Sequence, residues 1–316
     1  MKQGKTNTKI AGIDVGKHWL DVAIHGSRTS RVSNDKAGLA ELTAWLKAQG
    51  VVRVGLEASG GYERAACVAL AGAGLEVVLH QPLEVRLFAR LKRMKAKNDR
   101  LDAILIAAAT AHVDGVKAAA DPRLAELAER LTAYEQVSDL IATMKTELEH
   151  VTLKDLIGDF RVKIAAFTAL KAKMIKHMLG LIQAHPDLAA RLNLLRSLPG
   201  FGPVVAVSLL ARMPELGAMT HAQAASLAGV APFDRDSGAH KGRRTIAGGR
   251  ARPRRMLYIA ALAARRCDPG LRAFAQRLAE KGKPPKVILV AVMRKLVEAA
   301  NLVLARGEPW QIRQTP

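Results

Sequence analysis

The apolar and polar residues of the first 115 positions follow the periods of both strands and helices. Residues 9–25 hold two short β-branched runs around Gly16 and Lys17, which is the pattern of a β-hairpin. A compact apolar run at 51–56 ends at Glu57 and predicts a buried strand. The same patterns predict the other elements of this region: strands at 27–33 and 75–80, helices at 35–49 and 62–73, and mainly helix over 83–113. We therefore expect an α/β domain.

A different pattern begins after this region. Apolar residues recur at helical spacing, glycines are few and charges balance, which predicts a long helical hairpin or a coiled coil. Gly158 and the His185-Pro186 pair are its expected breaks, and the remaining chain is expected to be mostly helical. We therefore expect a chain of the α/β plus α class with three domains, at 1–118, 119–194 and 195–316.

Composition narrows the class of protein. The 316 residues are 49% apolar and 24% charged, as in globular proteins. Two cysteines allow neither a disulfide framework nor a four-cysteine zinc site, which favours a reducing, cytoplasmic location. The longest charge-free run, 216–233, is too polar for a membrane span, so we expect no membrane partner.

The excess of basic residues indicates a polyanionic partner. Forty-nine lysines and arginines stand against 28 aspartates and glutamates, a net charge of +21. Residues 1–118 hold 18 basic and 11 acidic side chains, residues 119–194 hold 10 of each, and residues 195–316 hold 21 and 7. We therefore expect both ends of the chain to bind nucleic acid, with a neutral segment between them.

Four carboxylates stand where a metal ion could be bound. Asp14 lies inside an apolar strand, Glu57 ends another, and Asp99 and Asp102 share one face of a predicted helix. A charge in an apolar strand is unfavourable unless it is paired or binds a metal ion, and Mg²⁺ or Mn²⁺ accepts carboxylate oxygens. The pattern favours a metal site for phosphoryl transfer. The alternative is that Asp14 caps a turn, Glu57 faces solvent and Asp99 caps its helix.

Two basic segments are candidates for contacts with a phosphate backbone. One contains no acid and is interrupted by glycines and a proline, and the other leads directly to Asp99. The expected contacts are Arg90, Lys92, Arg93, Lys95 and Lys97 before Asp99, and Lys241, Arg243, Arg244, Arg250, Arg252, Arg254 and Arg255 in the later segment. A solvated charged loop is the alternative for the later segment.

The sequence LPGFGP at 198–203 precedes an apolar helix. Gly200 and Gly202 in such a turn expose backbone N–H groups that can hold a phosphate, as in a helix-hairpin-helix element. The alternative is an ordinary turn between two helices.

Two hydroxyl residues are candidate nucleophiles. Ser237 needs a base or a metal ion to lose its proton, and spacing alone favours a serine in a turn. Tyr258 lies beside Arg254 and Arg255, which raises the alternative of a tyrosine recombinase. The apolar residues around Tyr258 favour a position in the core instead.

The motifs GIDVGKHWLDVAI, LEASGGYE, KNDRLDAILIA, LPGFGP and APFDRDSGAHKGRR occur in the order of one family. Together they resemble the DEDD insertion-sequence transposases, which include the Piv-type DNA invertases, over residues 9–305. The resemblance implies a ribonuclease-H-like (RuvC-like) first domain, a coiled-coil connector and a helical C-terminal domain. It also implies that Asp14, Glu57, Asp99 and Asp102 form the acidic tetrad and that Ser237 is the nucleophile.

The resemblance also implies an activity and partners. Members are recombinases that move or invert DNA, and those on insertion sequences are guided by a structured noncoding RNA. For this chain we expect donor and target DNA, a guide RNA, Mg²⁺ or Mn²⁺, a homo-oligomer (dimer or tetramer) and association with the nucleoid. The carboxylates and the serine are expected to act together, in one chain or from two protomers.

Two other classes of function stay open from the sequence. A RuvC-like, structure-specific endonuclease would hydrolyse DNA junctions with two metal ions and without a covalent step. A non-catalytic nucleic-acid-binding protein would have no use for four acids beside a phosphate path. Detection of a protein–DNA adduct, or of metal-dependent strand cleavage, separates these classes.

Overall fold

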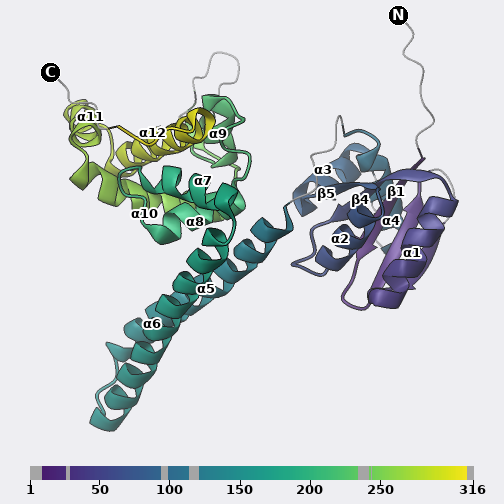
Figure 1. The fold of residues 1–316 in the computed structure, drawn as a ribbon, viewed down its shortest axis with the longest axis horizontal. Coiled ribbons are helices and arrows are strands. Elements are labelled where there is room, and N and C mark those ends of the chain that lie inside the picture. The colour runs from purple at the N-terminus through teal and green to yellow at the C-terminus, as the bar shows by residue number, and fades with distance from the viewer. Residues whose placement is uncertain are drawn as a thin grey trace, which may run out of the picture. The chain divides into compact units, whose positions relative to one another are not determined.

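The computed structural model describes residues 9–25, 29–93, 99–113, 121–233, 242 and 244–311, without the side chains of Asp99 and Arg100. The chain divides into two compact units, residues 1–120 and 121–316 (Figure 1). Among the described helices, none is both long enough and apolar enough to cross a membrane.

The first unit is built on a five-stranded mixed sheet. Its strands are β1 (Lys9–Val15), β2 (Trp19–Ile24), β3 (Thr29–Ser33), β4 (Val51–Glu57) and β5 (Glu76–His80). Their order is β3-β2-β1-β4-β5; β1 pairs antiparallel with β2 and parallel with β4. The predicted hairpin is confirmed, with the Gly16 N–H donating to the Trp19 carbonyl at 2.9 Å in its turn. The mixed sheet also confirms the predicted α/β class.

Different helices cover the two faces of this sheet. Helices α1 (Lys36–Ala48) and α2 (Arg64–Gly72) bury leucines on one face, against a core that includes Ile13. Helix α4 (Asp99–Thr110) packs on the opposite face, and α3 (Pro82–Leu91) packs on α4. Gly12 is required where α4 crosses β1, because a Cβ there would lie 2.2 Å from the backbone nitrogen of Ala107.

A helical hairpin begins the second unit. Helices α5 (Pro122–Leu148) and α6 (Lys154–Gln183) lie side by side, and α7 (Pro186–Arg196) starts at the expected proline (Figure 1). The expected break at Gly158 is wrong, because α6 continues through it and the turn lies at 149–153. A glycine in an exposed helix costs only about 1 kcal/mol relative to alanine, which the rest of a 30-residue helix outweighs. The hairpin is confirmed, and its supercoiling as a coiled coil stays a prediction.

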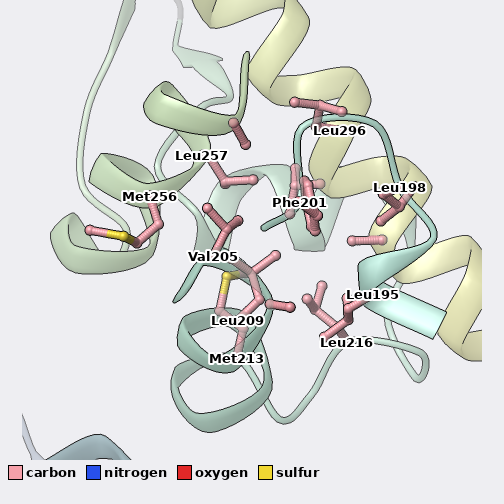
Figure 2. Packing of buried hydrophobic residues seen from close by; sticks show 14 of the residues in the cluster. Leu195, Leu198, Phe201, Val205, Leu209, Met213, Leu216, Met256, Leu257 and Leu296 are labelled. Carbon is pink, nitrogen blue, oxygen red and sulfur yellow. The ribbon is translucent and has the colours of Figure 1, made fainter. Parts of the chain in front are cut away.

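The remaining helices close a second core. The elements are α8 (Pro203–Arg212), α9 (His221–Leu227), β6 (Pro232–Phe233), β7 (Thr245–Ile246), α10 (Ala251–Cys267), α11 (Pro269–Glu280) and α12 (Pro285–Arg306). Figure 2 shows Phe201, Leu209, Leu257 and Leu296 converging from the turn before α8 and from α8, α10 and α12. Leu131 of α5 belongs to the same core, so the structure groups residues 121–194 with the C-terminal helices. The division into three domains stays a prediction.

Candidate functional site

Two of the predicted carboxylates lie at the carboxyl ends of neighbouring parallel strands. Asp14 and Glu57 directly follow the last registered pair of β1 and β4, Ile13 and Leu56. Side chains alternate along a strand, so both carboxylates point to the face that α4 covers, opposite the core that buries Ile13. Both are half-buried.

The direction of α4 places Asp102 at the same edge. Arg53, near the start of β4, donates from Nη1 to the Val113 carbonyl at 3.1 Å, beyond the end of α4. Further along β4, a Cβ on Gly55 would lie 1.8 Å from the Thr110 hydroxyl oxygen. Helix α4 therefore runs antiparallel to β4, and its first turn, with Asp102, lies toward the carboxyl ends of the strands.

The fold brings three of the four predicted carboxylates, Asp14, Glu57 and Asp102, to one edge of the sheet. Asp102 is half-buried, as Asp14 and Glu57 are, and the side chain of Asp99 lies outside the described residues. Among the described side chains, no three histidines, cysteines or acids are close enough to share one metal ion. The donor set, which consists only of carboxylate oxygens, nevertheless matches the preference of Mg²⁺ and Mn²⁺.

Asp14 and Glu57 belong to a row of polar residues across all five strands. Asp21 of β2 is registered with Asp14, and Arg31 of β3 with Asp21. On the other side, His80 of β5 is registered with Glu57. None of Asp21, Arg31 and His80 was predicted from the sequence as a residue of the site. The position of Asp21 could have been predicted from the sequence, because a hairpin whose turn is centred between Gly16 and Trp19 places residue 21 opposite residue 14.

His80 connects the sheet to the two helices beside the carboxylates. Its Nε2 lies 2.8 Å from the Thr110 hydroxyl, which donates to the Ile106 carbonyl, and its Nδ1 lies 3.8 Å from Glu84 of α3. Burial lowers the pKa of His80, and Glu84 opposes this shift. A neutral imidazole is consistent with its hydrogen bond to a hydroxyl group, so His80 helps to fix α4 on the sheet.

The loop after Glu57 is ordered by one buried carboxylate. Glu63 accepts hydrogen bonds from the Ser59 N–H, the Ser59 hydroxyl and the Gly61 N–H at 2.8–3.0 Å. Burial alone would raise the pKa of Glu63, but these hydrogen bonds offset it and hold the pKa below its usual value. The carboxylate of Glu63 is therefore used within the loop, which fixes how the chain leaves the site.

The basic segment before α4 is exposed where it is described. Arg90, Lys92 and Arg93 at the end of α3 are exposed, and the Lys92 ammonium lies 5.4 Å from the centroid of the Phe88 ring. Lys95 and Lys97 lie outside the described residues. The described part can therefore reach a phosphate backbone, and contact with nucleic acid stays a prediction.

The arginines at the start of α10 have partners within the chain. Arg250 contacts Glu215 at 2.6 Å, and Arg254 donates to the Gly248 carbonyl at 2.7 Å. Two more tie α10 to α5: Arg252 to Glu135 at 2.9 Å and Arg255 to Asp139 at 2.8 Å. Each of these four side chains therefore already has an ion pair or a hydrogen bond within the chain, which a phosphate contact would have to replace.

The remaining predicted residues stand in the basic segment before α10 and on α10 itself. Arg244 is exposed, whereas Ser237, Lys241 and Arg243 lie outside the described residues. The expectation that Tyr258 is a core residue is wrong, because 41% of it is exposed on the outer side of α10.

The LPGFGP turn has a packing role. Gly200 has φ of +78°, and a Cβ there would lie 2.3 Å from the Ala260 carbonyl of α10. The Phe201 N–H donates to Leu198 and the Gly202 N–H to Gly200, so both amides are used within the turn. Close packing thus explains Gly200 without a ligand, and phosphate binding by Gly200 and Gly202 stays a prediction.

Comparison with known families decides the class of protein. Residues 11–157 match the DEDD model of the IS110 transposases, described as "Transposase", and residues 192–276 match "Transposase IS116/IS110/IS902 family". The chain belongs to this transposase family. It is therefore a DNA recombinase, an enzyme of phosphoryl transfer.

Individual proteins similar to this transposase include two pilin gene-inverting proteins, from Moraxella bovis and Moraxella lacunata. Each is 26% identical over 318 residues, which is 96% of this chain and 97% of the relative. A solved RuvC structure from Thermus thermophilus matches 33% of the transposase and 93% of its own chain at 18% identity, with a TM-score of 0.27.

Proposed function

We propose that this transposase cleaves and exchanges DNA strands at the carboxylate edge of its first unit, with Ser237 as nucleophile and a structured RNA from its element as guide. The observation that supports the proposal most is the placement of Asp14 and Glu57 on adjacent strand ends, on the face toward which α4 brings Asp102. Membership of the transposase family supplies the type of reaction. A ribonuclease-H-like fold for the first unit is part of the same proposal.

Divalent cations are the proposed cofactor. Asp14, Glu57, Asp99 and Asp102 would hold Mg²⁺ or Mn²⁺, because these ions bind carboxylate oxygens. A bound ion would stabilise negative charge on phosphoryl oxygens. The residues themselves fix the geometry: the two strand ends hold two carboxylates at adjacent positions, and the close crossing of Gly12 by α4 limits how far Asp102 can move away.

Ser237 is proposed to form a covalent bond to DNA. Its hydroxyl oxygen bonds to phosphorus while the bond from phosphorus to one bridging sugar oxygen breaks. The serine proton leaves to a base or to solvent, and the released sugar oxygen takes up a proton. A second DNA hydroxyl then displaces the serine, so the phosphodiester is reformed without ATP.

Carboxylate variants test the first half of the proposal. Asp14→Asn, Glu57→Gln and Asp102→Asn should each lower strand cleavage by at least about 100-fold and leave nucleic-acid binding unchanged. Asp159→Asn, on the exposed side of α6, is the matched control and should cleave like wild type. Full cleavage activity in EDTA would refute a metal site.

Ser237→Ala tests the second half. It should bind DNA normally, yet give no protein–DNA adduct on denaturing gels and no recombinant product. An adduct that maps to Tyr258 would refute the serine mechanism. Cleavage without any adduct in the wild-type protein would favour hydrolysis by a RuvC-like endonuclease instead.

The proposed guide RNA follows from the charge of the chain and from the family. Each described ion pair removes one acid together with one base, so the net charge of +21 is unchanged by them, and a folded RNA is a suitable polyanion. The protein should be purified from cells that transcribe its flanking element, and the RNA that copurifies should be sequenced. Recovery of the same RNA species with and without the element would refute the assignment.

Self-association is proposed through the hairpin. Leu140 on α5 and Leu156, Val162 and Leu170 on α6 expose 40–66% of their area, more apolar surface than a solvated helix pair needs. Light scattering should give the mass of a dimer or tetramer, and Val162→Lys should lower it. A monomer at micromolar concentration would contradict this part.

A further inference from the structure

The ion pair between Asp21 and Arg31 stands beside the carboxylate edge without a role in the proposed function. Arg31 Nη2 lies 2.7 Å from one Asp21 carboxylate oxygen, and its Nε lies 3.0 Å from the other. Asp21 is 5% exposed, although Arg31 exposes half of its side chain. A buried carboxylate with a two-point contact has a fixed orientation, so this pair is rigid on the scale of the site.

The register of the sheet makes Asp21 a neighbour of Asp14. The two residues oppose each other directly on β1 and β2, and residues in this relation lie on one face with Cβ atoms about 5 Å apart. Two carboxylates in this position repel each other. The fold keeps them together because Arg31, opposite Asp21 on β3, neutralises one of them.

We propose that the Asp21–Arg31 pair is a positioning element of the carboxylate site, in which each partner prevents the other from disturbing Asp14. Asp21 holds the guanidinium so that it does not turn to Asp14 and compete with a cation. Arg31 neutralises Asp21 so that this carboxylate does not become an additional ligand. This inference rests on the proposed function, because it assumes that Asp14 binds a divalent cation.

The two single variants should shift cation affinity in opposite directions. Asp21→Asn removes the carboxylate that orients the Arg31 guanidinium, which can then turn toward Asp14, and Mn²⁺ binding should weaken by about tenfold, the size typical of residues that support a metal ligand. Arg31→Gln leaves Asp21 charged beside Asp14, so Mn²⁺ binding should tighten while strand cleavage falls. The double variant restores a neutral pair and should bind Mn²⁺ within about threefold of wild type, since the two sites are coupled.

The sheet offers a matched control. Arg53 and Glu76 form another registered cross-strand ion pair, at 2.8 Å, but near the amino ends of β4 and β5. Glu76→Gln should leave Mn²⁺ affinity unchanged. Binding is measured on the full 316-residue chain by electron paramagnetic resonance of free Mn²⁺, and circular dichroism checks that each variant is folded.

The outcomes separate this inference from the function on which it rests. If wild type binds Mn²⁺ no better than Asp14→Asn, the proposed metal site fails and the positioning role fails with it. If Asp14→Asn weakens binding but Asp21→Asn and Arg31→Gln do not change it, only the positioning role is overturned. Equal weakening by both single variants, with further loss in the double variant, would indicate damage to the fold and would also overturn it.

Discussion

Substitution of Gly12 by alanine is the sharpest test of how α4 is held at the carboxylate edge. The added Cβ would lie 2.2 Å from the Ala107 nitrogen and 2.3 Å from the Ala103 carbonyl oxygen. Ordinary contacts begin at 3.4 Å, so α4 must withdraw from β1 by about 1 Å. Both obstructing atoms belong to the backbone, so no side-chain rotation can relieve the clash.

The expected cost follows from this geometry. Overpacking of a well-packed core typically costs about 1–3 kcal/mol, and a contact between backbone atoms places Gly12→Ala at the upper end of this range. Withdrawal of α4 also moves Asp102 from Asp14. A misplacement of about 1 Å can lower catalysis by about 100-fold, so strand cleavage should fall further than stability does.

Gly158→Ala is the control for this variant. Gly158 lies inside α6 with no atom within 4 Å of an added Cβ, and alanine there should stabilise the chain by about 0.5–1 kcal/mol. Urea unfolding measures stability, and a metal-dependent nicking assay measures cleavage. If Gly12→Ala unfolds and cleaves like wild type, α4 is not held against β1 as the structure has it, and this packing does not bring Asp102 to the site.

Three further predictions concern other parts of the chain. Arg250→Ala should destabilise the second unit by about 2–3 kcal/mol in urea unfolding, because it leaves the half-buried Glu215 without its two-point contact. Burial, together with the nearby negative charge of Glu63, raises the pKa of the Cys67 thiol to about 11. A maleimide at pH 7 should therefore label the exposed Cys267 first, and faster labelling of Cys67 would contradict this burial. Replacing the exposed Lys281 and Lys283 by glutamine should reduce the salt dependence of nucleic-acid binding by up to about two units, and an unchanged slope would place them outside the interface.

Local signals predicted the first unit well. The Gly16-Lys17 turn, the helix predicted at 35–49 and the buried strand at 51–56 each depend on residues a few positions apart, and all three are present in the structure. Asp14 and Glu57 could be placed from the sequence for the same reason, since each lies in or at the end of an apolar run. The path of α4 could not, because it depends on Gly12, which looks ordinary until a helix crosses it.

Partners distant in sequence explain what the patterns could not show. Arg252 and Arg255 stand in a segment without an acid, which made them attractive as phosphate ligands. Their actual partners, Glu135 and Asp139, lie more than 100 residues earlier in α5. Periodicity indicates which side of a helix is buried, but it does not indicate which other helix supplies the counter-charge.

Charge totals by segment therefore describe the composition of this transposase better than its surface. The region 119–194 is neutral and the region 195–316 is strongly basic, which suggested a neutral segment followed by a basic end that binds nucleic acid. Folding places acids of α5 against arginines of α10. Part of the positive charge is therefore neutralised at the start of α10, in the segment with the most arginines. Each such pair uses an acid from the neutral segment 119–194, so one basic residue of that segment is no longer balanced. The excess of positive charge therefore moves from the C-terminal region to the hairpin, and its total is unchanged. The surface that nucleic acid meets must then be found among exposed lysines and arginines outside these pairs, such as Arg244, Lys281 and Lys283.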